Sequence, residues 1–504
     1  MSATACLTRI VATVGPASRE QSTLEALLRA GVSIFRLNFS HGDIASHLAT
    51  LQAIRAAEEA TGILAATLAD LPGPKIRVAK LPAPWDANGI DLPTGRVVRI
   101  GAGDACRGGD TPRLGCTYAG ITDDALPGHR LLIDDGAVRL LVIDREVGAE
   151  GTELVCTTVR GGVVRSGKGI NLPDSSVAAD PITDRDIAAI QAAVPAGVDF
   201  LGMSFVEDAE GLERLRHIAA GVARAHGREV PPIVAKIERP KAVEHIEAIV
   251  EACDAIMVAR GDLGVEMDFT KVPILQKRII AAARAAGKPA IVATQMLQSM
   301  VESPIPTRAE ASDVANAILD GCDAVMLSGE TAVGRWPIAA VEAMVRIARE
   351  AEAFQAESPH REPPEALVRA RNRVAALGHG ASRAARDLRA AAIVAWSQTG
   401  VTARLLSRYM FAVPIHAVST DRAALRRTRI LRGVEPVHVA SEPASFAEFV
   451  AKVEAELLAS RLVRRGDLCL LVSGERFGGG PSAIMAVREL GADDEPAPAG
   501  GGVL

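Results

Sequence analysis

Two charged residues, Lys236 and Glu238, lie two positions apart in the otherwise apolar stretch PIVAKIE. Residues two apart in a β-strand share one face, so both side chains are expected to point the same way. A lysine in an apolar strand is costly to bury unless it is paired or catalytic. The pair is therefore either a structural ion pair at the end of a strand or part of a reactive site.

A second pair with the same spacing, Arg260 and Asp262, ends the next apolar stretch, AIMVARGD. If the two stretches are neighbouring parallel strands, Glu238 and Asp262 lie at adjacent strand ends. Two carboxylates that offer only oxygen ligands suit a hard divalent cation, Mg²⁺ or Mn²⁺. The two pairs together are much harder to explain as structural ion pairs than either pair alone.

Arg36, Asn38 and Ser40 alternate in the same way in FRLNFS and are predicted to share one strand face. A guanidinium beside metal-binding carboxylates suits a phosphate or carboxylate group, and the alternative is a solvated arginine at a rim. Thr294 and Gln295 follow the apolar run IVA. The Thr294 hydroxyl is either part of the site or satisfies a backbone group.

The elements that must position these residues form a repeat of a short apolar run followed by an amphipathic stretch. Apolar strands that alternate with helices predict parallel strands covered by helices. Eight units over about 250 residues favour a closed (β/α)₈ TIM barrel over the alternative, a doubly wound open sheet. The eight runs are TRIVATVG, VSIFRLNFSHG, ILAATLAD, VDFLGMSF, PIVAKIE, AIMVARGD, PAIVATQM and AVMLSGE.

Polar residues near the ends of these runs support the barrel, because the carboxyl ends of its strands converge on one mouth where active sites lie. They are Asn38, Asp70, Ser204, Glu238, Asp262, Thr294 and Ser328.

The repeat is interrupted once and is followed by a third domain. We expect the barrel in residues 1–77 and 174–354, with an inserted small all-β lid domain in residues 78–173. An open α/β domain is expected in residues 355–490, in which AIMAVREL is predicted to be helical, and a disordered tail in 491–504. A lid at the mouth of the barrel could exclude water from the site.

Composition narrows the class of protein. The 504 residues carry a net charge of −5, so no basic field indicates nucleic acid or an anionic membrane as a partner. The seven cysteines form no C-x-x-C pair, which is typical of a reducing cytosol. We see no signal peptide and no transmembrane run, and expect a cytoplasmic protein.

Several long motifs resemble those of pyruvate kinase, in order, from Thr8 to about Leu490. They are FRLNFSHG, GPKIR, KGINLP, AKIE, IMVARGDLGVE, KPAIVATQMLQSM, PTRAEASDVANA and MLSGET. The resemblance implies a barrel, an inserted lid and a C-terminal α/β domain. It also implies transfer of the phosphoryl group of phosphoenolpyruvate to ADP, giving pyruvate and ATP, the last step of glycolysis.

The resemblance assigns roles at the mouth of the barrel. Glu238 and Asp262 would bind Mg²⁺ or Mn²⁺, and Lys236 and Arg36 would hold the phosphoryl group. Gly261, with Asp262, would bind the substrate carboxylate through backbone N–H groups. Thr294 would lie near the carbon that is protonated.

Other implied roles concern the nucleotide, assembly and regulation. Asn38, His41, Arg77 and Lys168 match positions around the nucleotide phosphates, although His41 could equally be structural. Family members are usually homotetramers, and many bind a phosphorylated effector in the C-terminal domain. The candidate groups for that effector are Ser397, Thr399 and Thr402 in WSQTGVT and the glycine loop at 474–480, in GERFGGGPS.

One departure from the best-known family pattern concerns K⁺. Many pyruvate kinases bind K⁺ at positions matching Asn38, Ser40 and Asp70 and at a threonine where this chain has Leu71. Those enzymes carry glutamate where this chain has Lys75, within ADLPGPKIR. A tethered ammonium at Lys75 could replace the ion, so we expect activity without K⁺; the alternative is that Lys75 points into solvent.

Two other functions remain open from the residues. A metal-dependent aldolase would also use Mg²⁺ and a pyruvate enolate, but would need neither Lys236 at a phosphoryl position nor Arg77 and Lys168 beside a lid. A catalytically dead homologue would show an eroded site, whereas the KIE, RGD, TQM and SGE motifs are intact.

Overall fold

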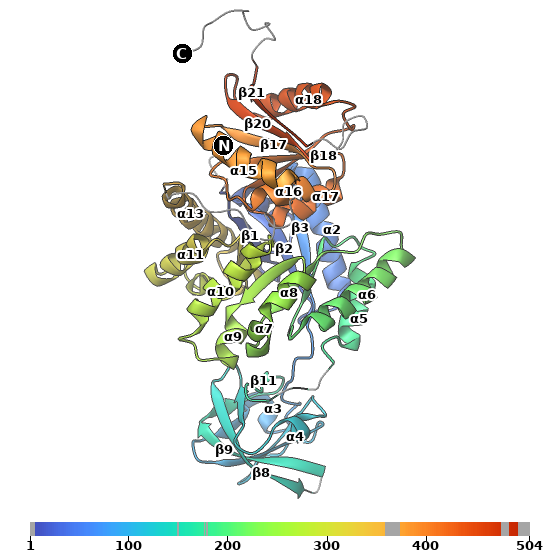
Figure 1. The fold of residues 1–504 in the computed structure, drawn as a ribbon. Coiled ribbons are helices and arrows are strands. Elements are labelled where there is room, and N and C mark those ends of the chain that lie inside the picture. The colour runs from blue at the N-terminus through green and yellow to red at the C-terminus, as the bar shows by residue number, and fades with distance from the viewer. Residues whose placement is uncertain are drawn as a thin grey trace, which may run out of the picture.

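A computed structural model describes residues 6–148, 151–175, 177, 180–357, 373–474 and 483–491. Figure 1 shows the barrel in the middle, an inserted β domain beyond one end of it and the C-terminal α/β domain against the other end.

Eight parallel strands close the barrel, as the sequence predicted. Nearly all of their residues are buried, because strands inside a ring of helices face the barrel interior on one side and the helices on the other. In chain order the strands are β1 (Arg9–Thr13), β2 (Val32–Asn38), β3 (Ala66–Asp70), β12 (Phe200–Met203), β13 (Ile233–Ile237), β14 (Ala255–Ala259), β15 (Ala290–Ala293) and β16 (Ala324–Leu327).

The helices between these strands begin at side-chain caps in several places. Asp43 and Asp208 each accept a backbone N–H in the first turn, and Thr183 and Thr307 form capping boxes. The ring contains α1 (Gln21–Ala30), α2 (Ile44–Thr61), α5 (Asp184–Ala193), α6 (Ala209–Ala225), α7 (Pro240–Glu244), α8 (Ile246–Ala252), α10 (Val272–Ala285), α11 (Arg308–Asp320) and α13 (Pro337–Ala356). Short helices α9 (Arg260–Glu266), η1 (Gln298–Val301) and α12 (Gly329–Ala332) follow β14, β15 and β16.

The inserted lid domain joins β3 to α5. Six of its strands form one sheet in the order β11-β7-β8-β9-β5-β6, and β10 pairs with β4. Its strands are β4 (Ile90–Leu92), β5 (Val97–Ala102), β6 (Arg113–Cys116), β7 (Arg130–Ile133), β8 (Val138–Gly148), β9 (Gly151–Arg160), β10 (Gly162–Val164) and β11 (Ile170–Asn171), with the short helices α3 (Trp85–Asn88) and α4 (Ile121–Asp124).

The C-terminal domain is a five-stranded sheet in the order β19-β18-β17-β20-β21, in which only β21 runs antiparallel to its neighbour. Its elements are α15 (Arg373–Asp387), β17 (Ala392–Trp396), α16 (Val401–Ser407), β18 (Ile415–Ser419), α17 (Arg422–Arg427), η2 (Thr428–Ile430), β19 (Val434–His438), α18 (Phe446–Ala459), β20 (Leu468–Ser473) and β21 (Ile484–Glu489).

One sequence prediction for this domain is wrong, and one of its strands was not predicted. AIMAVREL contains the strand β21 rather than a helix, because pairing with β20 outweighs the helix propensity of its residues. The strand β19 was not predicted, since VEPVH contains a proline and a charge. Most of the glycine loop and the expected tail lie outside the described residues.

The barrel and the C-terminal domain share one apolar cluster. Val11, Met257 and Ile291 of the barrel strands belong to the same buried group as Ile393 and Leu406 of the C-terminal domain. The lid domain has a separate cluster of its own. Among the helices of the described ranges, none is both long and apolar enough to cross a membrane.

Candidate active site

Lys236 lies at the carboxyl end of β13 with three partners around its ammonium group. Its Nζ is 2.9 Å from Glu238 Oε1 and 3.1 Å from Asp70 Oδ1, and it donates to Ser204 Oγ at 2.6 Å. Burial lowers the pKa of Lys236, but the charges of Asp70 and Glu238 outweigh that effect and raise it. The lysine is therefore a buried, fully charged group, and it shares a face with Glu238 as the spacing predicted.

Asp70 connects this lysine to Arg36. Its second carboxylate oxygen, Oδ2, accepts a hydrogen bond from Arg36 Nε at 2.6 Å. Burial raises the pKa of Asp70, but Lys236 and Arg36 reverse the shift, so that its pKa is lowered. Two cationic side chains thus converge at one barrel mouth around an ionised carboxylate.

Glu238 is held in place by the backbone as well. Its Oε2 accepts the Phe205 N–H at 2.8 Å, and only 2% of the residue is exposed. Burial raises the pKa of Glu238, Lys236 opposes the shift, and the negative charge of Asp262 adds to it. Glu238 is buried and Asp262 is half-buried, and two carboxylates that repel each other and keep oxygen lone pairs fit a divalent cation.

The described residues contain no cluster of three or more His, Cys, Asp and Glu side chains arranged for a metal. The candidate metal site therefore depends on two carboxylates. Glu238 and Asp262 would hold a Mg²⁺ ion, which would leave room for substrate oxygens and water as its further ligands.

Asp262 does not lie on a strand. The strand β14 ends at Ala259, and Arg260–Glu266 forms the helix α9, so the predicted strand alternation of Arg260 and Asp262 is wrong. Arg260 turns away to Asp313, at 2.8 Å, and to the Thr294 carbonyl, at 2.9 Å. Asp262 stays in the first turn of α9, where a carboxylate is favoured by the helix dipole.

Thr294 and Gly261 are in direct contact. The Gly261 N–H donates to Thr294 Oγ1 at 2.6 Å, and that hydroxyl donates to the Ala293 carbonyl at 2.6 Å. Thr294 has φ +70°, and Gln295 has φ +54°. Two consecutive non-glycine residues in this sparsely populated region indicate a backbone held at a strained corner of the site.

The residues of the monovalent-cation region are only partly brought together. Asn38 ends β2, but Ser40 lies beyond it in a turn, where its N–H donates to Asn38 Oδ1 at 3.2 Å, so its predicted place on the strand face is wrong. The Leu71 carbonyl accepts from Ser204 Oγ at 2.7 Å. Lys75 is exposed, and its Cε would lie 3.3 Å from a Cβ at Gly169, on the segment that returns from the lid.

The candidate nucleotide residues lie around the two connections of the lid. Arg77 forms a bridge with Gly169 and donates to the Gly167 carbonyl at 2.9 Å. Lys168 Nζ is 2.9 Å from Asp134 Oδ1 of the lid. Burial and then the charges of Arg77, Lys75 and Arg36 lower the pKa of His41. The positive charges around His41 suit an anionic ligand.

The candidate effector residues of the C-terminal domain are largely internal. Ser397 is fully buried and its Oγ accepts the Ala403 N–H at 3.1 Å, while Thr402 is 1% exposed. Thr399 is followed by Gly400, whose φ is +84°.

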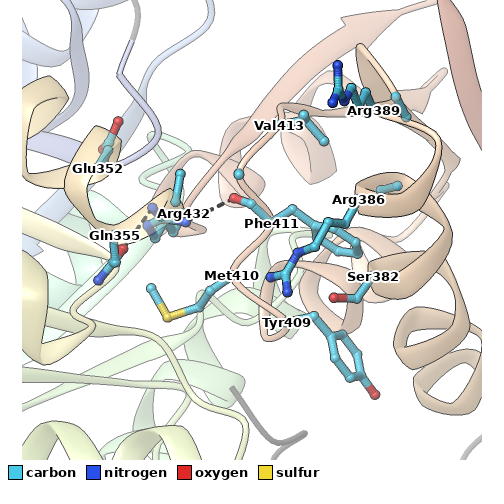
Figure 2. Close-up of a pocket in the computed structure, with 14 residues that line it drawn as sticks. Glu352, Gln355, Ser382, Arg386, Arg389, Tyr409, Met410, Phe411, Val413 and Arg432 are labelled. Carbon is cyan, nitrogen blue, oxygen red and sulfur yellow. Dashed lines mark hydrogen bonds between the residues drawn. The ribbon is translucent and has the colours of Figure 1, made fainter. Parts of the chain in front are cut away.

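A separate cavity of about 370 Å³ lies where α13 meets the C-terminal domain (Figure 2). There Arg432 donates to the Phe411 carbonyl and to Gln355 Oε1, both at 3.2 Å. This cavity belongs to the domain junction and not to the barrel mouth.

Sequence reasoning missed two partners of Lys236. Asp70 was assigned to the monovalent-cation region and, like Ser204, noted as a polar strand end, but neither was predicted to contact Lys236. The available signal was that Asp70 ends β3 and Ser204 directly follows β12, and the carboxyl ends of both strands meet at the mouth that holds Lys236.

Family profiles match most of the chain. A profile described as pyruvate kinase, barrel domain, matches residues 6–341, and one described as pyruvate kinase, alpha/beta domain, matches residues 375–487.

Curated relatives extend the likeness over the whole chain. A pyruvate kinase from Mycobacterium intracellulare is 41% identical over 490 residues, 96% of this chain and 99% of the relative. One from Corynebacterium glutamicum is 39% identical over 96% of this chain and 98% of the relative.

A solved structure agrees with these matches. The crystal structure of a pyruvate kinase from Cryptosporidium parvum superposes with a TM-score of 0.84 at 32% identity and covers 96% of both chains. With the buried lysine–carboxylate cluster at the barrel mouth, these likenesses establish that the chain is a phosphotransferase that belongs to the pyruvate kinase family.

Proposed function

We propose that this enzyme transfers the phosphoryl group of phosphoenolpyruvate to ADP in a Mg²⁺-dependent reaction that does not require K⁺. The observation that carries the proposal is the buried cluster of Lys236, Arg36, Asp70 and Glu238 beside Asp262. It presents positive charge to an anionic substrate and leaves two carboxylates for a metal ion.

Lys236 and Arg36 would bind the phosphoryl oxygens of phosphoenolpyruvate. A phosphoryl group in transfer carries its charge on its equatorial oxygens, and fixed cations at that place stabilise the transition state. Both cations are already oriented by Asp70, so little reorganisation is needed when the substrate arrives. Attack by ADP on phosphorus breaks the bond to the enol oxygen and leaves the enolate of pyruvate.

A divalent cation held by Glu238 and Asp262, Mg²⁺ or Mn²⁺, would supply positive charge to the substrate's carboxylate and enolate oxygens. The first turn of α9 would support the carboxylate through the backbone at Gly261 and Asp262. The Gly261 N–H would first have to leave Thr294 Oγ1, which it contacts at 2.6 Å.

Thr294 is suited to ordering a proton donor rather than to acting as one. Its only hydroxyl proton is given to the Ala293 carbonyl at 2.6 Å, and a threonine hydroxyl is a poor acid. We therefore assign protonation of the enolate's methylene carbon to a water or relay that Thr294 orders.

For the nucleotide, we propose Asn38, His41, Arg77 and Lys168 as the phosphate contacts. Arg77 and Lys168 lie on the two chain connections of the lid, so a change in lid position would move both toward or away from the mouth.

Independence from K⁺ is proposed because the anionic charge that would attract the ion is already balanced. Both oxygens of Asp70 bind cationic side chains, Leu71 has no hydroxyl, and Lys75 adds positive charge near His41. This would place the chain in a subgroup with lysine near the monovalent-cation region.

We also propose a homotetramer and an anionic effector of the C-terminal domain near Thr399. A mass from light scattering that differs from four chains would count against the homotetramer. Enzyme kinetics that do not change when sugar phosphates or nucleoside monophosphates are added would count against the effector.

The central test is formation of ATP from phosphoenolpyruvate and ADP, measured in a coupled assay. An aldolase would give none. Asp262→Asn should weaken Mg²⁺ binding, so that the Mg²⁺ concentration needed for half-maximal activity rises by orders of magnitude. The fold of the variant, measured by circular dichroism, should be kept. Lys236→Met should instead spare metal binding, lower phosphoryl transfer, and affect less the exchange of solvent protons into pyruvate. An unchanged Mg²⁺ requirement in Asp262→Asn would remove the metal assignment.

A further inference from the structure

The residues Ser204 and Phe205, directly after β12, contact Lys236 of β13 and Glu238, the residue that follows β13. Ser204 is 4% exposed, its Oγ accepts from Lys236 Nζ at 2.6 Å, and it donates its own proton to the Leu71 carbonyl at 2.7 Å. The next residue, Phe205, donates its N–H to Glu238 Oε2 at 2.8 Å. Ser204 and Phe205 therefore hold the two groups assigned above to phosphoryl binding and metal binding, Lys236 and Glu238.

The backbone of Phe205 is unusual in a way that serves this contact. Its φ is +54°, in the left-handed region that an aromatic residue seldom adopts. The Phe205 ring packs against Arg239, whose guanidinium lies 5.2 Å from the ring centroid. An outlier of this kind at a reactive site indicates a positional requirement.

The same two residues also pack against the chain that enters the lid. A Cβ on Gly73 would lie 2.9 Å from Phe205 Cδ2 and 3.2 Å from Ser204 Cβ, so only glycine allows this approach. Gly73 in turn donates its N–H to Asp186 Oδ1 at 3.0 Å. Leu71–Gly73, Ser204 and Lys236 thus form one continuous line of contacts from the lid connection to the reactive lysine.

The hydroxyl has a distinct effect on Lys236. An ammonium group has three N–H donors, and here the partners are two carboxylates and Ser204. Without the hydroxyl, only the carboxylates of Asp70 and Glu238 would orient Nζ, and they would draw it toward themselves rather than toward a phosphoryl group.

We propose that Ser204 and Phe205 are positioning residues for phosphoryl transfer: Ser204 aims Lys236, and the Phe205 N–H fixes Glu238, both in register with the lid connection. The proposal rests on the roles assigned above to Lys236 and Glu238.

The experiment for Ser204 is a double-mutant cycle with Lys236. Ser204→Ala should lower kcat by about 10- to 100-fold, a loss typical of one positioning contact, with KM for phosphoenolpyruvate and the Mg²⁺ activation constant changed less than threefold. In Lys236→Met the added Ser204→Ala should have almost no further effect, because the serine acts through the lysine. Full additivity of the two losses would overturn the assignment, as would a Ser204→Ala enzyme with wild-type kcat.

A matched control and a second variant keep the test decisive. Ser33, another buried serine, lies near the amino end of β2, at the end of the barrel opposite the mouth, and Ser33→Ala should keep kcat. If Ser204→Ala fails to fold, Ser204→Cys, with a weaker acceptor of similar size, should give an intermediate kcat. A wild-type kcat in that variant would equally overturn the assignment.

The experiment for Phe205 compares two replacements. Glycine tolerates φ +54°, so Phe205→Gly should keep the N–H near Glu238, whereas the β-branched Phe205→Val should not. We expect the Mn²⁺ activation constant to rise about tenfold in Phe205→Val and much less in Phe205→Gly. A larger rise in Phe205→Gly than in Phe205→Val would show that the Phe205 ring, and not its backbone conformation, positions Glu238, and would overturn the assignment. Absence of phosphotransfer in the wild-type enzyme would contradict the proposed function itself, whereas an active wild type with unaffected variants would contradict only this inference.

Discussion

At the scale of single residues, Asp70 is the carboxylate that joins the two cationic side chains of the barrel mouth. It is 1% exposed and binds Arg36 and Lys236 with its two oxygens, so the site holds its cations without an added ion. We therefore expect that, in a buffer whose only monovalent cation is tetramethylammonium, the enzyme is active and that KCl changes its rate little. Lys75→Glu should lower activity and create a response to K⁺. A rise of an order of magnitude on adding KCl to the wild-type enzyme would refute this expectation.

At the scale of elements, the helix α9 is tied to the lid. Asn171 of β11 donates to Glu266 Oε1, at the last residue of α9, at 2.8 Å, and Asp262 lies one turn earlier. Burial raises the pKa of Glu266. Asn171→Asp places a second carboxylate there, and the repulsion should loosen the lid and lower kcat/KM for ADP about tenfold. Adding Glu266→Gln restores one donor and one acceptor, so the double variant should recover most of the loss in steady-state kinetics. No recovery would argue against this contact.

The sequence predicted some of these features and could not predict others. The i, i+2 spacing placed Lys236 and Glu238 correctly because a strand has a fixed period. The same rule failed at Asp262 because the chain turns into α9 directly after Ala259, a local choice that spacing does not encode. The eight strands were recognisable from their apolar runs. The hydrogen bond from Lys236 to Ser204 depends on the register between β12 and β13, which no single stretch of sequence contains.

At the scale of the whole molecule, ion pairs join the C-terminal domain to the amino end of the barrel strand β1. Arg9 of β1 and Arg429 each bind Glu435 at 2.6 Å. Burial raises the pKa of Glu435, but the charges of Arg9 and Arg429 outweigh this effect and lower the pKa to about 2. The neighbouring His416 pairs in register with Glu435. Within the described residues neither ring nitrogen of His416 has a hydrogen-bond partner, and burial lowers its pKa to about 4.

This histidine predicts a pH dependence of stability. Between pH 6.5 and about pH 4 the unfolded chain binds a proton that the folded chain resists, so the stability from neutral His416 is complete above pH 6.5 and is lost as the pH falls. The loss is on the order of 3 kcal/mol. Between pH 7.5 and pH 5, the melting temperature of His416→Gln should therefore fall less than that of the wild type. The melting temperature of the exposed control, His438→Gln, should fall as much as that of the wild type. Equal slopes for all three proteins would contradict the assignment.

The two chain connections of the lid bear on whether the lid segment can be exchanged between related proteins. Val78 donates its N–H to the Lys168 carbonyl at 2.8 Å, so the points where the barrel sequence is interrupted are neighbours in space, and the insert has its own apolar cluster. In terms of gene architecture, we therefore expect that the lid segment can be exchanged for the corresponding segment of another family member without a change in the path of the barrel chain. Recombination at this junction would keep Glu238 and Asp262, the proposed metal ligands, and replace Lys168, a proposed nucleotide contact. We therefore expect the nucleotide preference to vary between family members more readily than the proposed chemistry at the three-carbon substrate.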